Sequence, residues 1–275
     1  MIIDAHTHTG CMLNFIMTEE MLLESMDKYN IDYCLCSNGE ATEFDHNHYL
    51  LPANMQKTQE SVYRTNLKFA RANRDKIGVL PWVKPYLQGV TDELERLIAE
   101  NLDITFGIKL HPFHSVTRFD SPRVQDYIRL AQQFNLTVLT HTGMGEYDNC
   151  TVVAKMAEKY PDVSFVMGHM GLGTDNSNAI ELVSQYPNLY GDTAWVSMES
   201  AIRCIEKCGS EKLIFGSDNT IDGVDTYDNN GKGSPSIYRK YFGELKAILS
   251  KEDYENLMYK NAVRIYRLSK LRDKC

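Results

Sequence analysis

Short apolar runs alternate with amphipathic segments along most of the chain. Several runs, such as Val163–Met167, are apolar almost throughout, which is typical of strands that are covered on both faces. Eight runs are predicted to be strands: Met1–Thr7, Ile31–Ser37, Ile77–Val83, Phe106–Leu110, Leu136–Thr140, Val163–Gly168, Leu189–Thr193 and Leu213–Ser217.

The segments between these strands carry apolar residues at helical spacing, and several begin with a cap residue. Ser121 followed by Pro122, for example, is the pair expected at a helix N-terminus. The predicted helices begin near Thr18 and span Ser61–Arg74, Thr91–Asn101, Ser121–Asn135, Thr151–Tyr160, Asn178–Tyr186 and Ser197–Cys208, with Pro235–Leu249 and Lys251–Leu268 after the last strand.

This alternation predicts an α/β fold, a (β/α)8 TIM barrel with extra C-terminal helices. An open doubly wound sheet is the alternative, but no G-x-G-x-x-G follows the first strand. Because no low-complexity linker divides the chain, we expect a single domain over residues 1–275. The long connections Asn38–Glu60 and Asn219–Ser234 follow strands, so both are expected on the C-terminal face as substrate walls or lids.

The composition and charge of the chain indicate which partners are unexpected and in which compartment the protein is expected. The formal net charge is −8 and no basic block occurs, which argues against binding to nucleic acid or to an anionic membrane. No apolar run is long enough for a membrane span. The seven cysteines form no paired framework and no secretory signal opens the chain, so we expect a cytoplasmic protein with Cys34 and Cys36 inside a strand. A homodimer is the default expectation for its oligomeric state.

Residues that bind metals or carry charge stand where the predicted strands end. His6 and His8 lie in the first strand, where side-chain alternation points both the same way. Four later strands end in the same manner, with Lys109, His141, His169 and Asp218. The carboxyl ends of barrel strands meet at one rim, and nothing about barrel stability requires histidines there. Together these residues predict a metal site.

These motifs resemble the metal-binding pattern of the amidohydrolase superfamily. The resemblance rests on His6-x-His8, on Lys109 in a Lys-Leu-His-Pro run, and on His141, His169 and Asp218. The chain is most similar to the branch that contains aminocarboxymuconate-semialdehyde decarboxylase and many predicted metal-dependent hydrolases. The segment Asn261–Tyr266 is similar to the C-terminal signature of that branch, so the resemblance runs from residue 3 to residue 268.

The resemblance implies one or two divalent metal ions, with zinc expected first and manganese, iron or cobalt accepted by the same ligands. His6, His8 and Asp218 would hold one ion, which lowers the pKa of its bound water to about 7. His141 would bind the same ion, or a second one alongside His169. In mononuclear relatives the residue that matches His169 orients water or polarises the substrate. His169 and Asp218 are therefore the predicted catalytic residues, with Asp218 carrying the proton.

Lys109 has two open roles, because a free ammonium group cannot ligate a metal. If carboxylated, as in dihydroorotase-like enzymes, Lys109 would bridge two ions; otherwise it would be a cation for the substrate or for a neighbouring carboxylate. His111 and Trp195 are the predicted substrate-binding residues, although each also has a structural interpretation at the barrel rim. Asp192 is expected to orient a ligand rather than to bind the metal.

Other polar residues receive structural interpretations. Asp4 is expected on the same inward face as His6 and His8, but deeper, as a hydrogen-bonding residue. His46 and His48 lie in a long polar loop and are expected to be solvated, with a substrate contact left open.

The predicted function is that of a metal-dependent hydrolase. It would use a metal-activated water to cleave an amide, cyclic amide, lactone or ester bond in a small-molecule substrate. The alternative is non-oxidative decarboxylation of an unsaturated or aromatic carboxylic acid, for which the sequence assigns no arginine to the pocket. A non-catalytic barrel that binds a metal or ligand is the third hypothesis, and it predicts a closed coordination shell.

Overall fold

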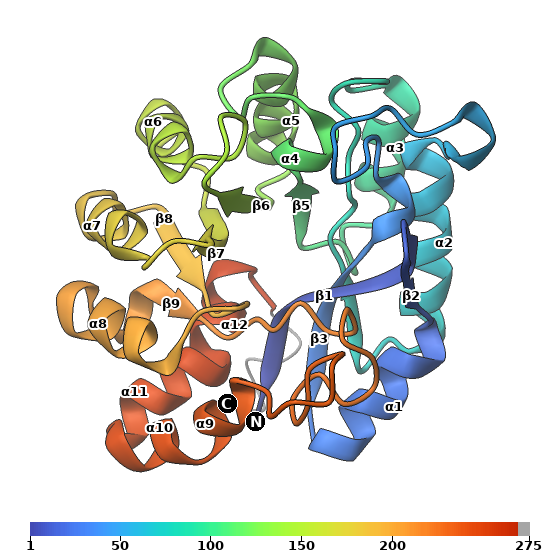
Figure 1. Ribbon diagram of the computed structural model, residues 1–275. Coiled ribbons are helices and arrows are strands. Elements are labelled where there is room, and N and C mark those ends of the chain that lie inside the picture. Colours follow the sequence, from blue (N-terminus) through green and yellow to red (C-terminus); the bar gives the residue numbers. More distant parts are fainter. Residues whose placement is uncertain (269–275) are drawn as a thin grey trace.

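The computed structural model describes residues 1–268, and the alternation of strands and helices predicted from the sequence is confirmed there (Figure 1). The parallel strands occupy the middle of the molecule and most of the helices surround them. The parallel strands are β1 (Ile3–Met12), β3 (Tyr33–Asn38), β4 (Ile77–Val79), β5 (Gly107–Leu110), β6 (Thr137–Gly143), β7 (Phe165–Leu172), β8 (Leu189–Asp192) and β9 (Leu213–Ile214).

The strands follow the order of a TIM barrel but are hydrogen-bonded as two sheets. One sheet has the order β2-β1-β3-β4, where β2 is Phe15–Met17, and the other has the order β5-β6-β7-β8-β9. Isolated parallel bridges join the sheets at both seams, between Trp82 and Lys109 on one side and between Thr7 and Asn219 on the other. The TIM-barrel prediction is confirmed, although the ladder of hydrogen bonds is interrupted at the two seams.

Four of the helices that follow the strands begin at the predicted caps. Thr18, Thr91, Ser121 and Ser197 each accept a hydrogen bond from a backbone N–H in the first turn of a helix. The helix predicted from Ser61 is capped by Thr58 instead. The helices are α1 (Glu19–Tyr29), α2 (Gln59–Ala72), α3 (Asp92–Glu100), α4 (Pro112–Ser115), α5 (Pro122–Gln133), α6 (Cys150–Lys159), α7 (Ser177–Gln185), α8 (Met198–Cys208), α9 (Tyr238–Phe242), α10 (Glu244–Ile248), α11 (Lys251–Glu255) and α12 (Asn261–Ile265).

Several elements differ from the sequence prediction. The strands predicted at Ile77–Val83 and Leu213–Ser217 end at Val79 and Ile214. The first strand extends to Met12 and turns back through Leu13, at φ +56°, to pair antiparallel with β2. The predicted helix Pro235–Leu249 is two short helices, because the backbone of Gly243 (φ −106°, ψ −83°) interrupts it. The predicted last helix is divided too, since residues 256–260 form a π-helical turn between α11 and α12. The predicted domain ends at residue 275, and residues 269–275 lie outside the described part.

The core consists of two main clusters that alternate along the strands. One cluster contains Tyr33 and Leu35 of β3 together with Val263 and Ile265 of α12, so the C-terminal helix packs against the barrel interior. Cys34 and Cys36 belong to the other cluster, with residues of the surrounding helices, and both are fully buried. Their predicted place inside a strand is confirmed. No helix within residues 1–268 is long and apolar enough to cross a membrane.

The first strand contains an irregularity that sets the direction of its side chains. The register between β1 and β3 shifts between Asp4 and Thr7, so β1 carries one extra residue there. Asp4 consequently bonds Ser217 and Tyr227 instead of lying on the face of the two histidines. The predicted hydrogen-bonding role of Asp4 is confirmed. The expectation that it shares the face of His6 was wrong, because the extra residue breaks the simple alternation.

Candidate active site

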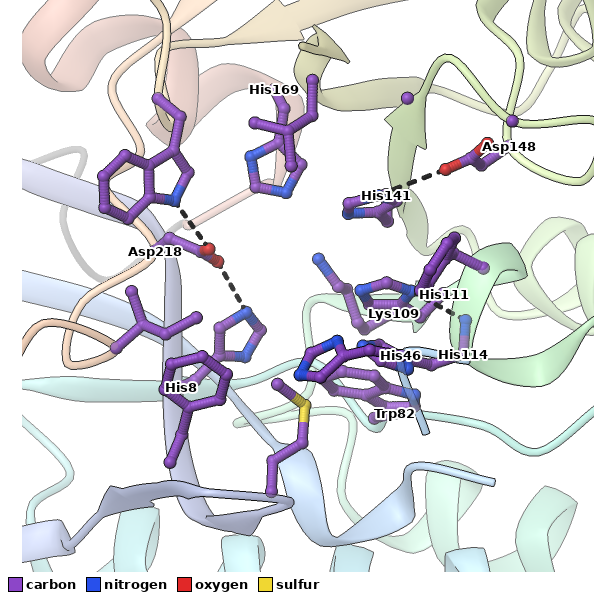
Figure 2. A pocket seen from close by; sticks show the side chains of 18 of the residues that line it. His8, His46, Trp82, Lys109, His111, His114, His141, Asp148, His169 and Asp218 are labelled. Carbon is purple, nitrogen blue, oxygen red and sulfur yellow. Dashed lines mark hydrogen bonds and ion pairs between the residues drawn. The ribbon is translucent and has the colours of Figure 1, made fainter. Parts of the chain in front are cut away.

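The structure brings the predicted rim residues together at the carboxyl ends of the strands, and all of them except His6 line one cavity (Figure 2). β1 supplies His6 and His8, β5 supplies Lys109, β6 supplies His141 and β7 supplies His169, while Asp218 follows β9. All six are largely or fully buried. These residues, which are up to 212 positions apart (6 to 218), meet because the strands are parallel and adjacent.

Two of the histidines have a ring proton whose position is determined by the protein. The Nδ1 atom of His6 lies 2.7 Å from Asp192 Oδ2, and the Nδ1 atom of His169 lies 3.2 Å from the Ala194 carbonyl oxygen. A carboxylate or carbonyl oxygen accepts, so Nδ1 donates in both rings. In the neutral rings the Nε2 atoms therefore keep their lone pairs.

The lone pairs converge on the carboxylate of Asp218. His6 Nε2 lies 3.2 Å and His8 Nε2 lies 2.9 Å from Asp218 Oδ1. His8 Nδ1 faces the hydroxyl and carbonyl oxygens of Ser37, at 2.9 and 3.3 Å, and with its proton there His8 also presents a bare Nε2. Lone pairs that face a carboxylate repel one another unless a cation lies between them.

The donor set fits a divalent metal ion. One ligand atom from each of His6, His169 and Asp218 lies within 4.8 Å of the other two. Imidazole nitrogen and carboxylate oxygen are common ligands of zinc and of other divalent transition metals. Burial lowers the pKa of His6 and His169 well below the usual value, which favours the neutral, ligating form of both rings.

Lys109 supplies a cation within this group. It is fully buried, and its Nζ donates to His6 Nε2 at 2.6 Å. Burial lowers its pKa to about 8, while the negative charges of Asp218 and Asp192 act in the opposite direction. The structure thus places Lys109 at the predicted site. A bridging role after carboxylation stays a prediction.

His141 has a partner that the sequence did not indicate. Its Nε2 lies 3.3 Å from Asp148 Oδ2, and its Nδ1 is buried without a partner among the described residues. With the proton on Nε2, the free Nδ1 lone pair is available to a metal. Asp148 was missed because it lies in the loop after β6, where hydrophobic periodicity carries no signal.

Two residues near the rim hold the predicted metal ligands in place. Asp192 bonds His6, as expected, and its Oδ1 also accepts from the backbone N–H of His169 at 2.8 Å. Trp195 Nε1–H donates to Asp218 Oδ2 at 2.9 Å. His169, Trp195 and Asp218 all have positive φ, at +70°, +58° and +65°. This conformation costs roughly 1–2 kcal/mol per residue, and such strain clusters at functional sites.

The cavity above these residues has a volume of about 620 Å³ and a largely apolar wall. The long loops contribute to it as predicted, with His46 from the first and Ile221 and Asp222 from the second. His46 thus faces the pocket, whereas His48 is half-buried and packs against Phe113. The apolar lining residues are Met12, Phe15, Trp82, Phe113, Met144, Leu172, Trp195 and Ile221.

The two predicted substrate-binding residues both line this cavity. His111 is stacked between Trp82 and His141, with ring centroids 5.1 and 4.1 Å away. Trp195 contributes its indole N–H to Asp218, so it contacts the predicted catalytic carboxylate as well as the cavity. Their contact with a substrate stays a prediction.

Comparisons with known proteins agree with this arrangement. Residues 3–268 match the family model of the amidohydrolases. No curated protein sequence is significantly similar to the chain.

Among solved structures, the chain resembles 5-carboxyvanillate decarboxylase from Sphingomonas paucimobilis, with a TM-score of 0.68 and 14% identity over 97% of this chain and 98% of that one. It also resembles 4-oxalomesaconate hydratase from Rhodopseudomonas palustris, with a TM-score of 0.70 and 15% identity over 100% and 99%. A third structure is 5-carboxyvanillate decarboxylase from Novosphingobium aromaticivorans complexed with manganese, with a TM-score of 0.68 and 11% identity over 97% and 96%. At these identities the likeness concerns the fold, whereas the match that covers residues 3–268 concerns the family. The chain therefore belongs to the amidohydrolase family.

Proposed function

We propose that this amidohydrolase-family enzyme is a metal-dependent decarboxylase that releases CO2 from an aromatic or unsaturated carboxylic acid. The observation that carries the proposal is the pocket itself, in which aromatic and aliphatic side chains lie beside a cluster of residues that could hold a metal ion. Flat apolar rings suit such walls, and the carboxylate of an aromatic acid would reach the ligand cluster at the end of the cavity.

The charge of the pocket agrees with an acidic substrate. Lys109 is the only lysine or arginine among the cavity-lining residues that the structure describes. Its Nζ lies beside His6, next to the predicted metal site. Lys109 and the metal together would supply the positive charge for which the sequence assigned no arginine.

The reaction asks little of the protein beyond positioning and one proton. The bond between the ring or alkene carbon and the carboxylate breaks, CO2 leaves without the bonding electron pair, and the carbon takes up one proton. A divalent metal would supply Lewis-acid stabilisation of developing negative charge. Asp218 is the residue we assign to carrying the proton, with Trp195 orienting its Oδ2 atom.

Two further observations support decarboxylation over the hydrolysis that the sequence suggested first. Similar folds include decarboxylases of 5-carboxyvanillate and of 2,6-dihydroxybenzoate, although a hydratase shares the fold as well. A small polar amide or ester would leave most of the apolar wall of this cavity without a matching surface. Hydrolysis therefore becomes the second candidate.

A paired assay tests the proposal. Protein reconstituted with zinc or manganese is incubated with benzoic and unsaturated acids, with CO2 detection, and in parallel with esters, lactones and cyclic amides. CO2 release from an acid is expected, and it should disappear in Asp218→Asn, even at saturating metal, while the fold persists. Turnover of an ester or amide with no CO2 from any acid would establish hydrolysis instead, and a folded protein that binds no divalent ion would contradict both.

Several predictions made from the sequence are kept as part of this proposal. Zinc remains the metal expected first, although manganese occurs in one structural relative. The small-molecule substrate, the cytoplasmic location, the single domain and the homodimer stay predictions of the same kind.

A further inference from the structure

His111 and His114 form a pair of rings beside the metal-binding cluster, with centroids 4.6 Å apart (Figure 2). The ring proton of each is placed by the backbone. The His114 backbone N–H donates to His111 Nδ1 at 3.3 Å, so in the neutral ring the proton of His111 is on Nε2. His114 Nδ1 lies 2.8 Å from the Phe44 carbonyl oxygen, which only accepts, so in the neutral ring of His114 Nε2 is bare.

The surroundings hold both rings firmly. The backbone N–H of Phe44 donates to the His114 carbonyl at 2.9 Å, so the loop that follows β3 is bonded to His114 in both directions. His111 is stacked on Trp82 at an interplanar angle of 8°. Burial lowers the pKa of His114 to about 4, so that ring is neutral at physiological pH.

Neither Nε2 atom has a partner among residues 1–268, although both histidines line the cavity. The cavity wall therefore presents one hydrogen-bond donor, His111 Nε2–H, next to one acceptor, His114 Nε2. A donor and an acceptor that are held rigidly and have no protein partner are suited to a ligand group that forms hydrogen bonds with both.

We propose that His111 and His114 form a subsite that binds a neutral hydroxyl group on the ring or chain of the substrate. A hydroxyl oxygen accepts from His111 Nε2–H while its own proton is donated to His114 Nε2. This inference rests on the proposed function, because it takes the cavity to be the substrate pocket, and it narrows the substrate class to hydroxylated acids.

Other substituents match the pair less well. A methoxy oxygen has no proton, so it would leave the lone pair of His114 unsatisfied. A carboxylate has only acceptors and would face that lone pair with negative charge, and an ammonium group has only donors and would face the N–H of His111. The hydroxyl group is thus favoured by the positions of the ring protons, on Nε2 of His111 and on Nδ1 of His114, and not by shape alone.

Two substitutions remove the cavity-facing nitrogens and keep the structural contacts. In His111→Asn the amide oxygen can still accept from the His114 backbone N–H, and asparagine is a favourable residue at a helix start. In His114→Asn the amide NH2 can still donate to the Phe44 carbonyl. Both variants lack the atom at the position of Nε2.

The test measures the binding of phenol and of anisole to metal-loaded protein by calorimetry, so that no turnover is needed. Phenol is expected to bind about tenfold or more tightly than anisole, because anisole leaves the lone pair of His114 Nε2 unsatisfied. The preference should vanish in His114→Asn, whereas His111→Asn, which removes the donor that both probes use, should weaken the binding of both. Equal binding of the two probes, no binding of either, or a preference that survives in His114→Asn would overturn the inference. The CO2 assay tests the proposed function separately from the calorimetry. The two experiments together distinguish a decarboxylase that does not prefer phenol from a hydrolase that does.

Discussion

Asp192 holds two histidines of the predicted metal site, and its replacement by asparagine tests how the ligand set is organised. The Oδ2 atom of Asp192 accepts from His6 Nδ1, and Oδ1 accepts from the backbone N–H groups of His169 and Ala194. Asparagine can keep the two backbone contacts with its amide oxygen. Its NH2 group then faces the Nδ1–H group of His6. Both groups are donors, so they cannot form a hydrogen bond with each other.

The expected loss of metal affinity follows from the replacement of an acceptor by a donor opposite His6 Nδ1. His6 can pair with the NH2 group only by moving its own proton to Nε2, the atom that faces Asp218. A protonated Nε2 cannot bind a metal, so one ligand is lost unless the new contact is broken. Outer hydrogen-bond partners of ligating histidines are typically worth 10–100-fold in metal affinity, or about 1.4–2.8 kcal/mol. We expect Asp192→Asn to lower the metal affinity by a factor near the upper end of this range.

The assay is equilibrium competition for zinc or manganese against a chelator of known affinity. Glu43→Gln is the matched control, because Glu43 is an equally buried carboxylate that bonds the backbone N–H of Leu87 and no predicted ligand. Burial raises the pKa of Asp192, so removing its charge should not reduce the thermal stability of the metal-free protein. Metal binding by Asp192→Asn as tight as that of the unmodified protein, with an intact fold, would refute the reasoning.

Three further predictions concern other side chains. Asp148→Asn should lower activity about tenfold or more, because the carboxylate no longer holds the proton on His141 Nε2, and activity equal to the unmodified protein at saturating metal would contradict that role. Trp195→Phe should reduce the rate by about tenfold with little effect on metal content, since the indole N–H that orients Asp218 is lost while every predicted metal ligand is kept. Burial raises the pKa of Glu43 from 4.5 to about 7. The stability from neutral Glu43 is therefore present below pH 4.5 and lost as the pH rises through 7. The melting temperature of Glu43→Gln should rise relative to the unmodified protein over that range, and a constant difference would exclude the effect.

Much of the fold could be predicted from local sequence. The apolar runs located the strands within a few residues, and the cap residues located most of the helix starts, because both signals depend on neighbouring positions along the chain. Asp4 shows where such reasoning fails. One extra residue in β1 changed the face on which its side chain lies, and no periodicity reveals an irregularity of one residue.

The candidate site divides in a similar way. The sequence by itself determined which residues stand at the rim, because histidine, lysine and aspartate at strand ends must meet when parallel strands form a barrel. Only the tertiary structure decided which nitrogen of each ring is free. Asp192 lies 186 positions from His6, and Phe44 lies 70 positions from His114, yet these acceptors determine where the ring protons are. A ring proton goes to the nearest acceptor in space, and distance along the chain does not indicate which acceptor that is.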